Sequence, residues 1–260
     1  MSARIVPARH GLLWLLAGVN LLRREPRQLV MLAVGYYLVL ALFIRGLHTL
    51  GILLLALALP AISAALANGV RALDHGQKLA LGKLKEGLPA GKQALLRLGG
   101  VQLLGTLLLG GLSTLLGSDV RFDDGLTIEE LQELIGDLSI LLLAATPWMM
   151  AFWFAPLLAL WQQMPAGKAL FFSLLASWHN WRAFLVYGLA VALVAGVVPG
   201  ALLIFASMLG QPVLNVVSLL LRLALIFGLA PVLVCSSYVS WRDVFAPEAP
   251  KAPETAVTDA

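Results

Sequence analysis

Arg222 is the residue whose type and position most clearly suggest chemistry. It is the only ionisable side chain well inside a long apolar run, 213–238, and no acidic residue lies at a comparable position in the other runs. A guanidinium offers two parallel N–H donors and stays charged, so Arg222 could bind an anionic headgroup or solute, with Gln102 beside it. The alternative is a structural role, in which the long side chain reaches from the apolar run back to water.

Catalytic and metal-binding patterns are absent from the sequence. No Asp or Glu lies inside a long apolar run, and the chain has no H-E-x-x-H or G-x-S-x-G motif. The four histidines lack ligand spacing, and the single cysteine, Cys235, allows neither a disulfide within the chain nor a thiolate cluster. The run 123–125 (Asp-Asp-Gly) fails as a calcium loop because Val120 and Phe122 occupy ligand positions. We therefore expect no enzymatic activity, no metal ion and no cofactor.

The composition is that of a membrane protein. Apolar residues make up 60% of the chain and charged residues 12%, with a mean hydropathy of +0.90, whereas soluble proteins carry roughly 25% charged residues. Eighteen basic and 14 acidic residues cannot cover the surface of a soluble protein of 260 residues. This excludes a soluble enzyme, a nucleic-acid-binding domain and a disordered chain. Membrane lipids are the expected partners.

Six apolar segments approach or reach the length of a membrane-crossing helix, which takes about 20 residues. They are 28–44, 47–67, 96–116, 138–161, 183–208 and 213–238. A tight turn at Arg45-Gly46 makes the first two a hairpin. The run 23–27 (Arg-Arg-Glu-Pro-Arg) stands where a signal peptide would have its cleavage site, so the N-terminal apolar stretch is retained. The sequence predicts an all-α membrane protein with six transmembrane helices.

Charge predicts the orientation of these segments. Fifteen of the 18 Lys and Arg residues fall on one side of the membrane, and the loop 118–137 on the other side carries seven acidic residues against Arg121. By the positive-inside rule, both termini are cytoplasmic. Thr127 and Glu130 form a capping box that predicts a helix over 127–137, running into the fourth segment. Its acidic face is either solvated or a surface for a basic partner.

A threefold internal repeat organises the segments. Each odd segment follows a short amphipathic stretch, which we expect to lie as a helix on the cytoplasmic leaflet. These stretches are 11–24, 76–88 and 167–181. The repeats would cover 8–70, 75–164 and 165–240, related about an axis along the membrane normal. They form one membrane domain, 1–246, followed by a disordered cytoplasmic tail, 247–260. The alternative is chance recurrence in a chain rich in Ala and Leu.

Each even segment carries one proline in its cytoplasmic half. These are Pro60, Pro156 and Pro231. A proline inside a helix lacks the N–H group and clashes with the carbonyl four residues earlier, so each should kink its helix. The freed carbonyls would be those of Ala56, Phe152 and Phe227. Because such groups need a partner inside a bilayer, the kinks could surround a small polar cavity, or they could only improve helix packing.

The stretch 152–188 carries a recognisable motif. Its residues are Ala155-Pro156, Met164-Pro165, Lys168-Ala169-Leu170 and Asn180-Trp181-Arg182. The motif resembles the signature region of an uncharacterised proteobacterial family of polytopic inner-membrane proteins, whose opening is also similar to Gly11, Trp14, Arg23-Arg24 and Pro26 here. The arrangement of transmembrane segments and amphipathic stretches is more loosely similar to the membrane domain that accompanies some bacterial glycerophosphodiester phosphodiesterases. The resemblance implies a bacterial inner membrane and carries no activity.

The function that follows is that of a non-enzymatic integral membrane protein, which binds lipid or organises partners in the inner membrane. The alternative is a transporter or channel for a small, uncoupled or anionic solute. A polar cavity lined by Arg222, Gln102 and the proline kinks would favour transport, and a dry centre would favour the structural role. Protein partners and oligomeric state do not follow from the sequence.

Overall fold

The computed structural model describes residues 3–116 and 128–245, with the side chains of 128–135 left out. Every regular element in these ranges is a helix, and five helices are long and apolar enough to cross a membrane. The predicted all-α membrane fold is confirmed at this level. The predicted tail, 247–260, and residues 118–127 of the predicted acidic loop lie outside the described residues. The helix predicted over 127–137 is described from Ile128 onward and continues into the fourth segment.

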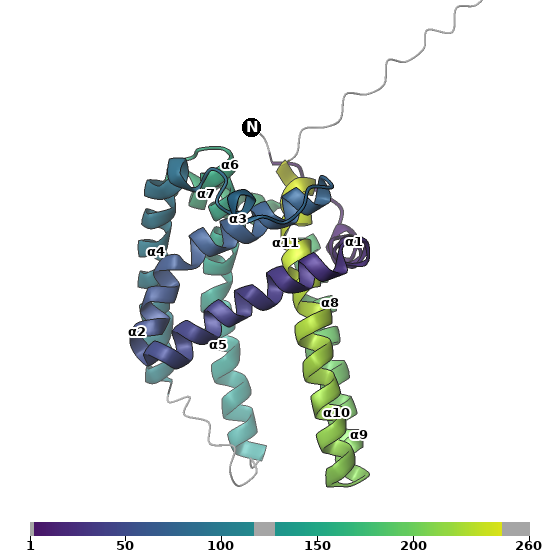
Figure 1. Ribbon diagram of the computed structural model, residues 1–260. Helices are drawn as coiled ribbons and strands as arrows, with labels where there is room; N and C mark the ends of the chain where they lie inside the picture. The colour runs from purple at the N-terminus through teal and green to yellow at the C-terminus, as the bar shows by residue number, and fades with distance from the viewer. Residues whose placement is uncertain (1–2, 117–127, 246–260) are drawn as a thin grey trace, which may run out of the picture.

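The N-terminal third consists of α1 (His10–Arg24) and α2 (Pro26–Asp74). Helix α1 matches the first predicted amphipathic stretch. A straight helix of 49 residues would measure roughly 75 Å, more than twice the thickness of a hydrocarbon core. Instead α2 folds back on itself at His48, where φ is 48° and ψ is −127° (Figure 1). The two arms touch closely, because a Cβ added to Gly51 would lie 1.7 Å from the carbonyl oxygen of Phe43.

The connection to the next long helix differs from the prediction. The only helix between α2 and α4 (Leu88–Leu115) is the single turn α3 (Leu81–Leu84), so the amphipathic helix predicted over 76–88 is wrong. Gly76 and Gly87 both adopt positive φ, 69° and 73°, and these left-handed residues interrupt the helix. Helix α4 consequently begins eight residues earlier than predicted.

The proline kink predicted at Pro156 is present. Helix α5 (Ile128–Trp153) ends one residue before Phe154, and α6 (Ala155–Trp161) begins with the proline in its first turn. Helix α7 (Ala166–His179) supplies hydrogen bonds to the backbone at this break. There the Ser173 hydroxyl accepts a hydrogen bond from the N–H of Phe154 and donates one to the carbonyl of Met150, both at 2.9 Å. The carbonyl that Ser173 satisfies is that of Met150, whereas the sequence predicted a freed carbonyl at Phe152.

The C-terminal third is a hairpin of two continuous helices, each with one π-helical turn. The first comprises α8 (Trp181–Ala192), η1 (Leu193–Val197) and α9 (Val198–Met208), and the second α10 (Gln211–Ala224), η2 (Leu225–Leu229) and α11 (Ala230–Phe245). Each π turn lies just before a proline, Pro199 or Pro231. The disturbance predicted at Pro231 thus takes the form of a π bulge. By contrast, α2 continues through Pro60, and its described non-helical residue is His48.

Figure 1 shows two columns of helices that meet at one end. Helices α4 and α5 form one column and α8 to α11 the other, while α1 lies across the end of the second. The two arms of α2 slant between the columns, from the fold beside α4 to α1 and α11. Two glycines allow α1 to approach closely. A Cβ on Gly11 would lie 2.1 Å from the carbonyl oxygen of Ala183, and one on Gly18 would lie 2.7 Å from that of Val232.

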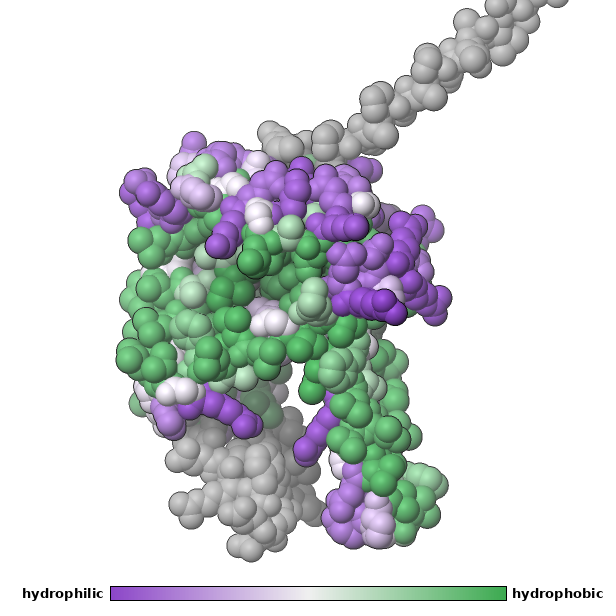
Figure 2. All heavy atoms as spheres, in the orientation of Figure 1, coloured by the Kyte–Doolittle hydropathy of each residue, from purple (hydrophilic) through white to green (hydrophobic). Residues whose placement is uncertain are grey.

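The core lies at the end where the columns meet. Trp14 is 1% exposed, and its ring packs edge-on against Phe184 at 5.2 Å between centroids. Trp153, Phe154 and Tyr187 extend this aromatic cluster. Figure 2 shows hydrophilic residues gathered at the same end, beyond a broad apolar surface. We call this the polar end of the molecule.

Candidate functional site

The two residues predicted to bind an anion lie in different columns. Arg222, on α10, is exposed, lines none of the cavities described below and forms no hydrogen bond or ion pair with the described residues. Gln102, on α4, is half-buried and accepts a hydrogen bond from Nε1 of Trp148 at 3.2 Å. The structure does not bring them into one described cavity, and their shared site stays a prediction.

The three prolines of the even segments are all buried. Pro60 and Pro231 are among the most completely buried side chains of the described residues, and Pro156 is buried beside Phe154. None of the three lines a cavity described here. Their surroundings are those of packed helices.

Among the motif residues, Asn180 makes the most contacts. It is 1% exposed and caps the junction of α7 and α8. Its Oδ1 accepts a hydrogen bond from the N–H of Val6 at 2.7 Å, and its Nδ2 donates to the carbonyls of Arg4 and Ala176, each at 2.9 Å. The amide thereby fastens the segment before α1 to the junction of α7 and α8.

The other motif residues shape turns or face outward. Pro165 is the N-cap of α7, and the N–H of Met164 reaches the carbonyl of Leu158 at 3.3 Å. Trp181 and Arg182 are exposed, with the guanidinium 5.5 Å from the centre of the indole ring. The motif therefore holds together the turns on either side of α7.

An apolar hollow among the described residues, which we call the seam groove, has a volume of about 530 Å³. It lies between α1 and the C-terminal hairpin, and its lining is almost entirely aliphatic. Both π turns contribute, Val194 from η1 and Leu225, Gly228 and Leu229 from η2. Sequence reasoning missed this groove, although the prolines that follow both π turns were visible.

Two further apolar grooves lie at the other helix junctions. One, of about 440 Å³, lies between α5 and α7 and includes Trp178. The other, of about 510 Å³, lies between α2 and α4, with Lys92 in its lining. In the first groove the short helix α7 packs against α5, and in the second the start of α4 packs against α2.

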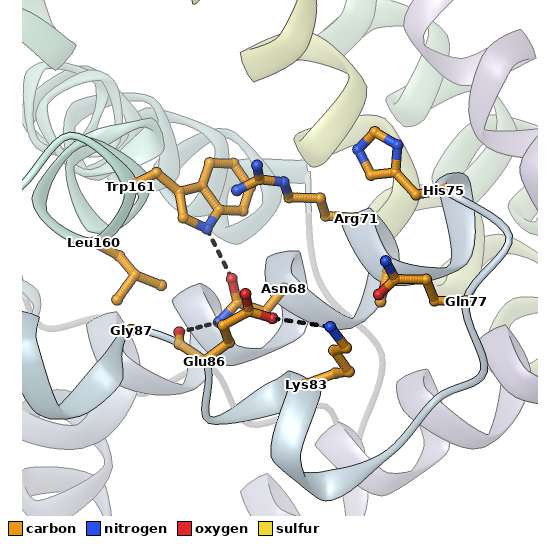
Figure 3. Close-up of a pocket in the computed structure, with 10 residues that line it drawn as sticks. Asn68, Arg71, His75, Gln77, Lys83, Glu86, Gly87, Leu160 and Trp161 are labelled. Carbon is orange, nitrogen blue, oxygen red and sulfur yellow. Dashed lines mark hydrogen bonds and ion pairs between the residues drawn. The ribbon is translucent and has the colours of Figure 1, made fainter.

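A polar pocket of about 330 Å³ opens at the polar end, between the end of α2, the α3–α4 connection and the end of α6 (Figure 3). Asn68, which is 7% exposed, holds these three parts together. Its Oδ1 accepts a hydrogen bond from Nε1 of Trp161 at 2.7 Å, and its Nδ2 donates to the carbonyls of Leu84 and Glu86 at 3.2 and 2.8 Å. Because the amide is fully used, its role is to build the pocket.

Charged side chains also line this pocket. The guanidinium of Arg71 lies over the ring of Trp161, 5.1 Å from its centre. Across the pocket, Nζ of Lys83 is 3.5 Å from a carboxylate oxygen of Glu86. Such an arrangement can hold an anion by hydrogen bonds from cationic groups.

Sequence reasoning counted Arg71 and Lys83 only as charges that orient the chain. Trp161 is 90 positions from Arg71, so only the packing of α2 against α6 brings them together. One signal was available, since Asn68 is an amide at the end of an apolar segment and buried amides need partners.

Two carboxylates, Asp243 and Asp74, connect α11 with α1 and α2. Asp243 accepts hydrogen bonds from Nδ1 of His10 at 2.7 Å and from Nε1 of Trp14 at 2.8 Å. Asp74 accepts hydrogen bonds from the hydroxyl of Tyr238 and from Arg242, at 3.0 and 2.6 Å. Helix α11 is therefore fastened to α1 and to α2 by polar contacts.

The long apolar helices, with shorter helices and charged residues gathered at one end, define a polytopic helical membrane protein. The chain is 32% identical over 267 residues to a probable inner membrane protein of Burkholderia thailandensis, and the match covers 96% of this chain and 97% of the relative. The chain belongs to the family of that protein and is a multi-pass inner-membrane protein. No family model matches the chain. No solved structure matches it either.

Proposed function

We propose that this protein is a non-enzymatic membrane protein that binds phospholipid, with an acyl chain in the seam groove. The observation that carries the proposal is the lining of that groove, which is almost wholly aliphatic and comes from α1 and from two helices long enough to cross the bilayer. Water gains no hydrogen bonds in such a hollow, whereas a hydrocarbon chain fills it favourably.

The position of α1 supports a phospholipid rather than a free hydrocarbon. Leu12, Leu15 and Leu22 of α1 line the groove, and Arg23 and Arg24 follow in the last turn of the same helix. An acyl chain in the groove would therefore place a phosphate near two guanidinium groups, which pair well with phosphate.

Filling the groove tests the proposal. A Cβ added to Gly228, which lines the groove, meets no atom within 4 Å, so Gly228→Leu should fold and occupy the space of the ligand. We expect this variant to lose most of the phospholipid that co-purifies with the native protein, as counted by native mass spectrometry in detergent.

The matched control is Gly188→Leu. Gly188 is also helical, is exposed on α8, and has open space around an added Cβ, but it does not line the groove. Its lipid content should equal that of the native protein. Equal lipid content in all three proteins would refute binding in the seam groove.

Transport of a small, possibly anionic solute is the second candidate. One feature favours it, because Arg222 lies one turn before η2 and π bulges often mark functional sites. Solute flux through proteoliposomes would distinguish a transporter from a protein that only binds lipid.

We also propose that the two arms of α2 cross the membrane separately, which makes six crossings with both termini in the cytoplasm. The fold at His48 supports two separate arms. The gathering of hydrophilic residues at the polar end supports a cytoplasmic position for that end.

The packing of the short helices supports the threefold repeat. Helix α3 packs on α2, α7 packs on α5 and α6, and α1 packs on α11. Each short helix thus packs against the Pro-bearing helix of the preceding proposed repeat. Helix α1, in the first repeat, packs against α11 in the last, as a cyclic arrangement requires.

A further inference from the structure

The polar pocket remains unexplained by lipid binding in the seam groove. The two hollows share no lining residue, and the pocket carries charged and amide side chains where the groove is aliphatic. The pocket opens at the polar end, between the end of α2, the α3–α4 connection and the end of α6.

Arg71 supplies a cation that forms no ion pair and no hydrogen bond with the described residues. Its guanidinium carbon lies over the ring of Trp161, 5.1 Å from the ring centre. Arg242, by contrast, is paired with Asp74 at 2.6 Å. The N–H groups of Arg71 can therefore donate hydrogen bonds to an oxyanion.

Lys83 supplies a second cation, and its existing pairing is weak. Its side chain is 41% exposed and that of Glu86 is 68% exposed, with 3.5 Å between the charged atoms. Exposed ion pairs of this kind contribute little free energy. An anion can therefore take over Lys83 at small cost, while His75 and Gln77 form the polar wall beside it.

Helix α4 adds to these two cations. Its N-cap, Gly87, lines the pocket. The N–H of Leu88 already donates to the carbonyl of Lys85 at 3.1 Å, and Pro89 has no N–H. Helix α4 therefore contributes the partial positive charge of its N-terminus, which favours anions, rather than free backbone donors.

The pocket is organised before a ligand arrives, because Asn68 ties its three walls together. Its volume of about 330 Å³ is at the small end of ligand sites and suits a phosphate group with its first substituents. We propose that this pocket binds the phosphate group of a phospholipid headgroup or of a soluble phosphate compound, through Arg71 and Lys83.

The test uses the full-length protein in nanodiscs of phosphatidylcholine. Inorganic phosphate and glycerol 3-phosphate are titrated by calorimetry, with chloride as the reference anion. A second arm reconstitutes the protein in an equimolar mixture of phosphatidylcholine and phosphatidylglycerol and counts the retained phosphatidylglycerol by native mass spectrometry. Binding in the first arm identifies a soluble phosphate site, and binding only in the second identifies a headgroup site.

Arg71→Gln should weaken binding by about tenfold or more, because a charge-assisted donor pair is lost. Arg71→Lys should be intermediate, since it keeps the charge without the planar donors. The control is Arg182→Gln, which removes an exposed arginine that also stacks on a tryptophan, Trp181, outside the pocket. It should bind as the native protein does.

Lys83→Gln is a second pocket variant in case Arg71→Gln does not fold, because Lys83 lies in a short connection rather than against a tryptophan. The proposal is overturned if the native protein binds in neither arm, or if folded pocket variants bind as tightly as Arg182→Gln. The seam groove is tested separately by Gly228→Leu, so either proposal can fail alone.

Discussion

Single buried polar side chains hold distant parts of this chain together. The amide of Asn180 hydrogen-bonds to the segment before α1, and the amide of Asn68 connects the walls of the polar pocket. Asp243 joins α1 to α11. Buried polar groups of this kind are costly to leave unpaired. The residues that fasten this structure are consequently few and specific.

Asn180→Ala should destabilise the protein by about 1–3 kcal/mol, because the N–H of Val6 and the carbonyl of Arg4 lose a partner. Cys235 provides the measurement. It is the only cysteine and is fully buried, so a thiol-reactive dye reports its exposure during heating. We expect a Tm several degrees below that of the native protein, at about 2–4 °C per kcal/mol.

The control for Asn180 is Asn215→Ala on α10. Asn215 is exposed, and its Oδ1 accepts a hydrogen bond from Gln211 in the same helix. Its Tm should stay near the native value. If Asn180→Ala melted with the control, the amide would not fasten the N-terminal segment.

At the scale of elements, glycines set how closely helices approach. Helix α4 packs against α2 through Gly99, where an added Cβ would lie 2.0 Å from the carbonyl oxygen of Leu57. Small residues at such crossings are the usual means of helix association in membranes. The neighbouring Gly100 has no atom within 4 Å of an added Cβ.

This pair gives a matched prediction. Gly99→Ala should destabilise the protein by about 1–3 kcal/mol, since the helices must move apart. Gly100→Ala should be neutral or stabilise it by up to about 1 kcal/mol through helix propensity. Thermal unfolding of the two variants in the same detergent is the measurement. A loss of stability in Gly100→Ala equal to that in Gly99→Ala would contradict the close contact.

The elements that sequence reasoning located well have unambiguous local signals. Helix α1 has an apolar face and a basic last turn, and the break at Pro156 follows from the missing N–H group. The helix predicted over 76–88 was wrong because the positive φ angles of Gly76 and Gly87 cannot be inferred from the sequence. The spacing of apolar residues in this stretch is compatible with a helix as well as with the irregular connection that the structure has.

The candidate sites were beyond sequence reasoning for a different reason. Arg71 lies on α2 and Trp161 on α6, and their contact depends on how these two helices pack against each other. The seam groove likewise needs α1, η1 and η2 together. Arg222 drew attention because charge within an apolar segment is visible in the sequence, whereas cavities are not.

For the whole molecule, the proposed topology can be tested with single cysteines in a Cys235→Ala background. Lys78→Cys lies at the polar end, Gln211→Cys at the turn between α9 and α10, and Gly46→Cys near the fold of α2. We expect an impermeant maleimide to label the last two in intact spheroplasts, and Lys78→Cys only after permeabilisation. The reason is the concentration of Lys and Arg at the polar end, which the positive-inside rule places in the cytoplasm.

The outcome at Gly46 distinguishes two arrangements of α2. Labelling of Gly46→Cys together with Gln211→Cys means that both arms cross the membrane. Labelling with Lys78→Cys, or from neither side, would contradict six crossings and make the α2 hairpin re-entrant.

The closure of α1 onto the last hairpin has a consequence for biosynthesis. Helix α1 leaves the ribosome first, but Ala183 and Val232, against which Gly11 and Gly18 pack, are made far later. At about 5–20 residues per second, α1 waits roughly ten to forty seconds for its final partner. As an amphipathic helix, α1 can lie on the membrane surface during this interval. A nascent chain that stalls before α11 leaves the face of α1 around Gly18 uncovered, so the docking of α1 requires that α11 has been made.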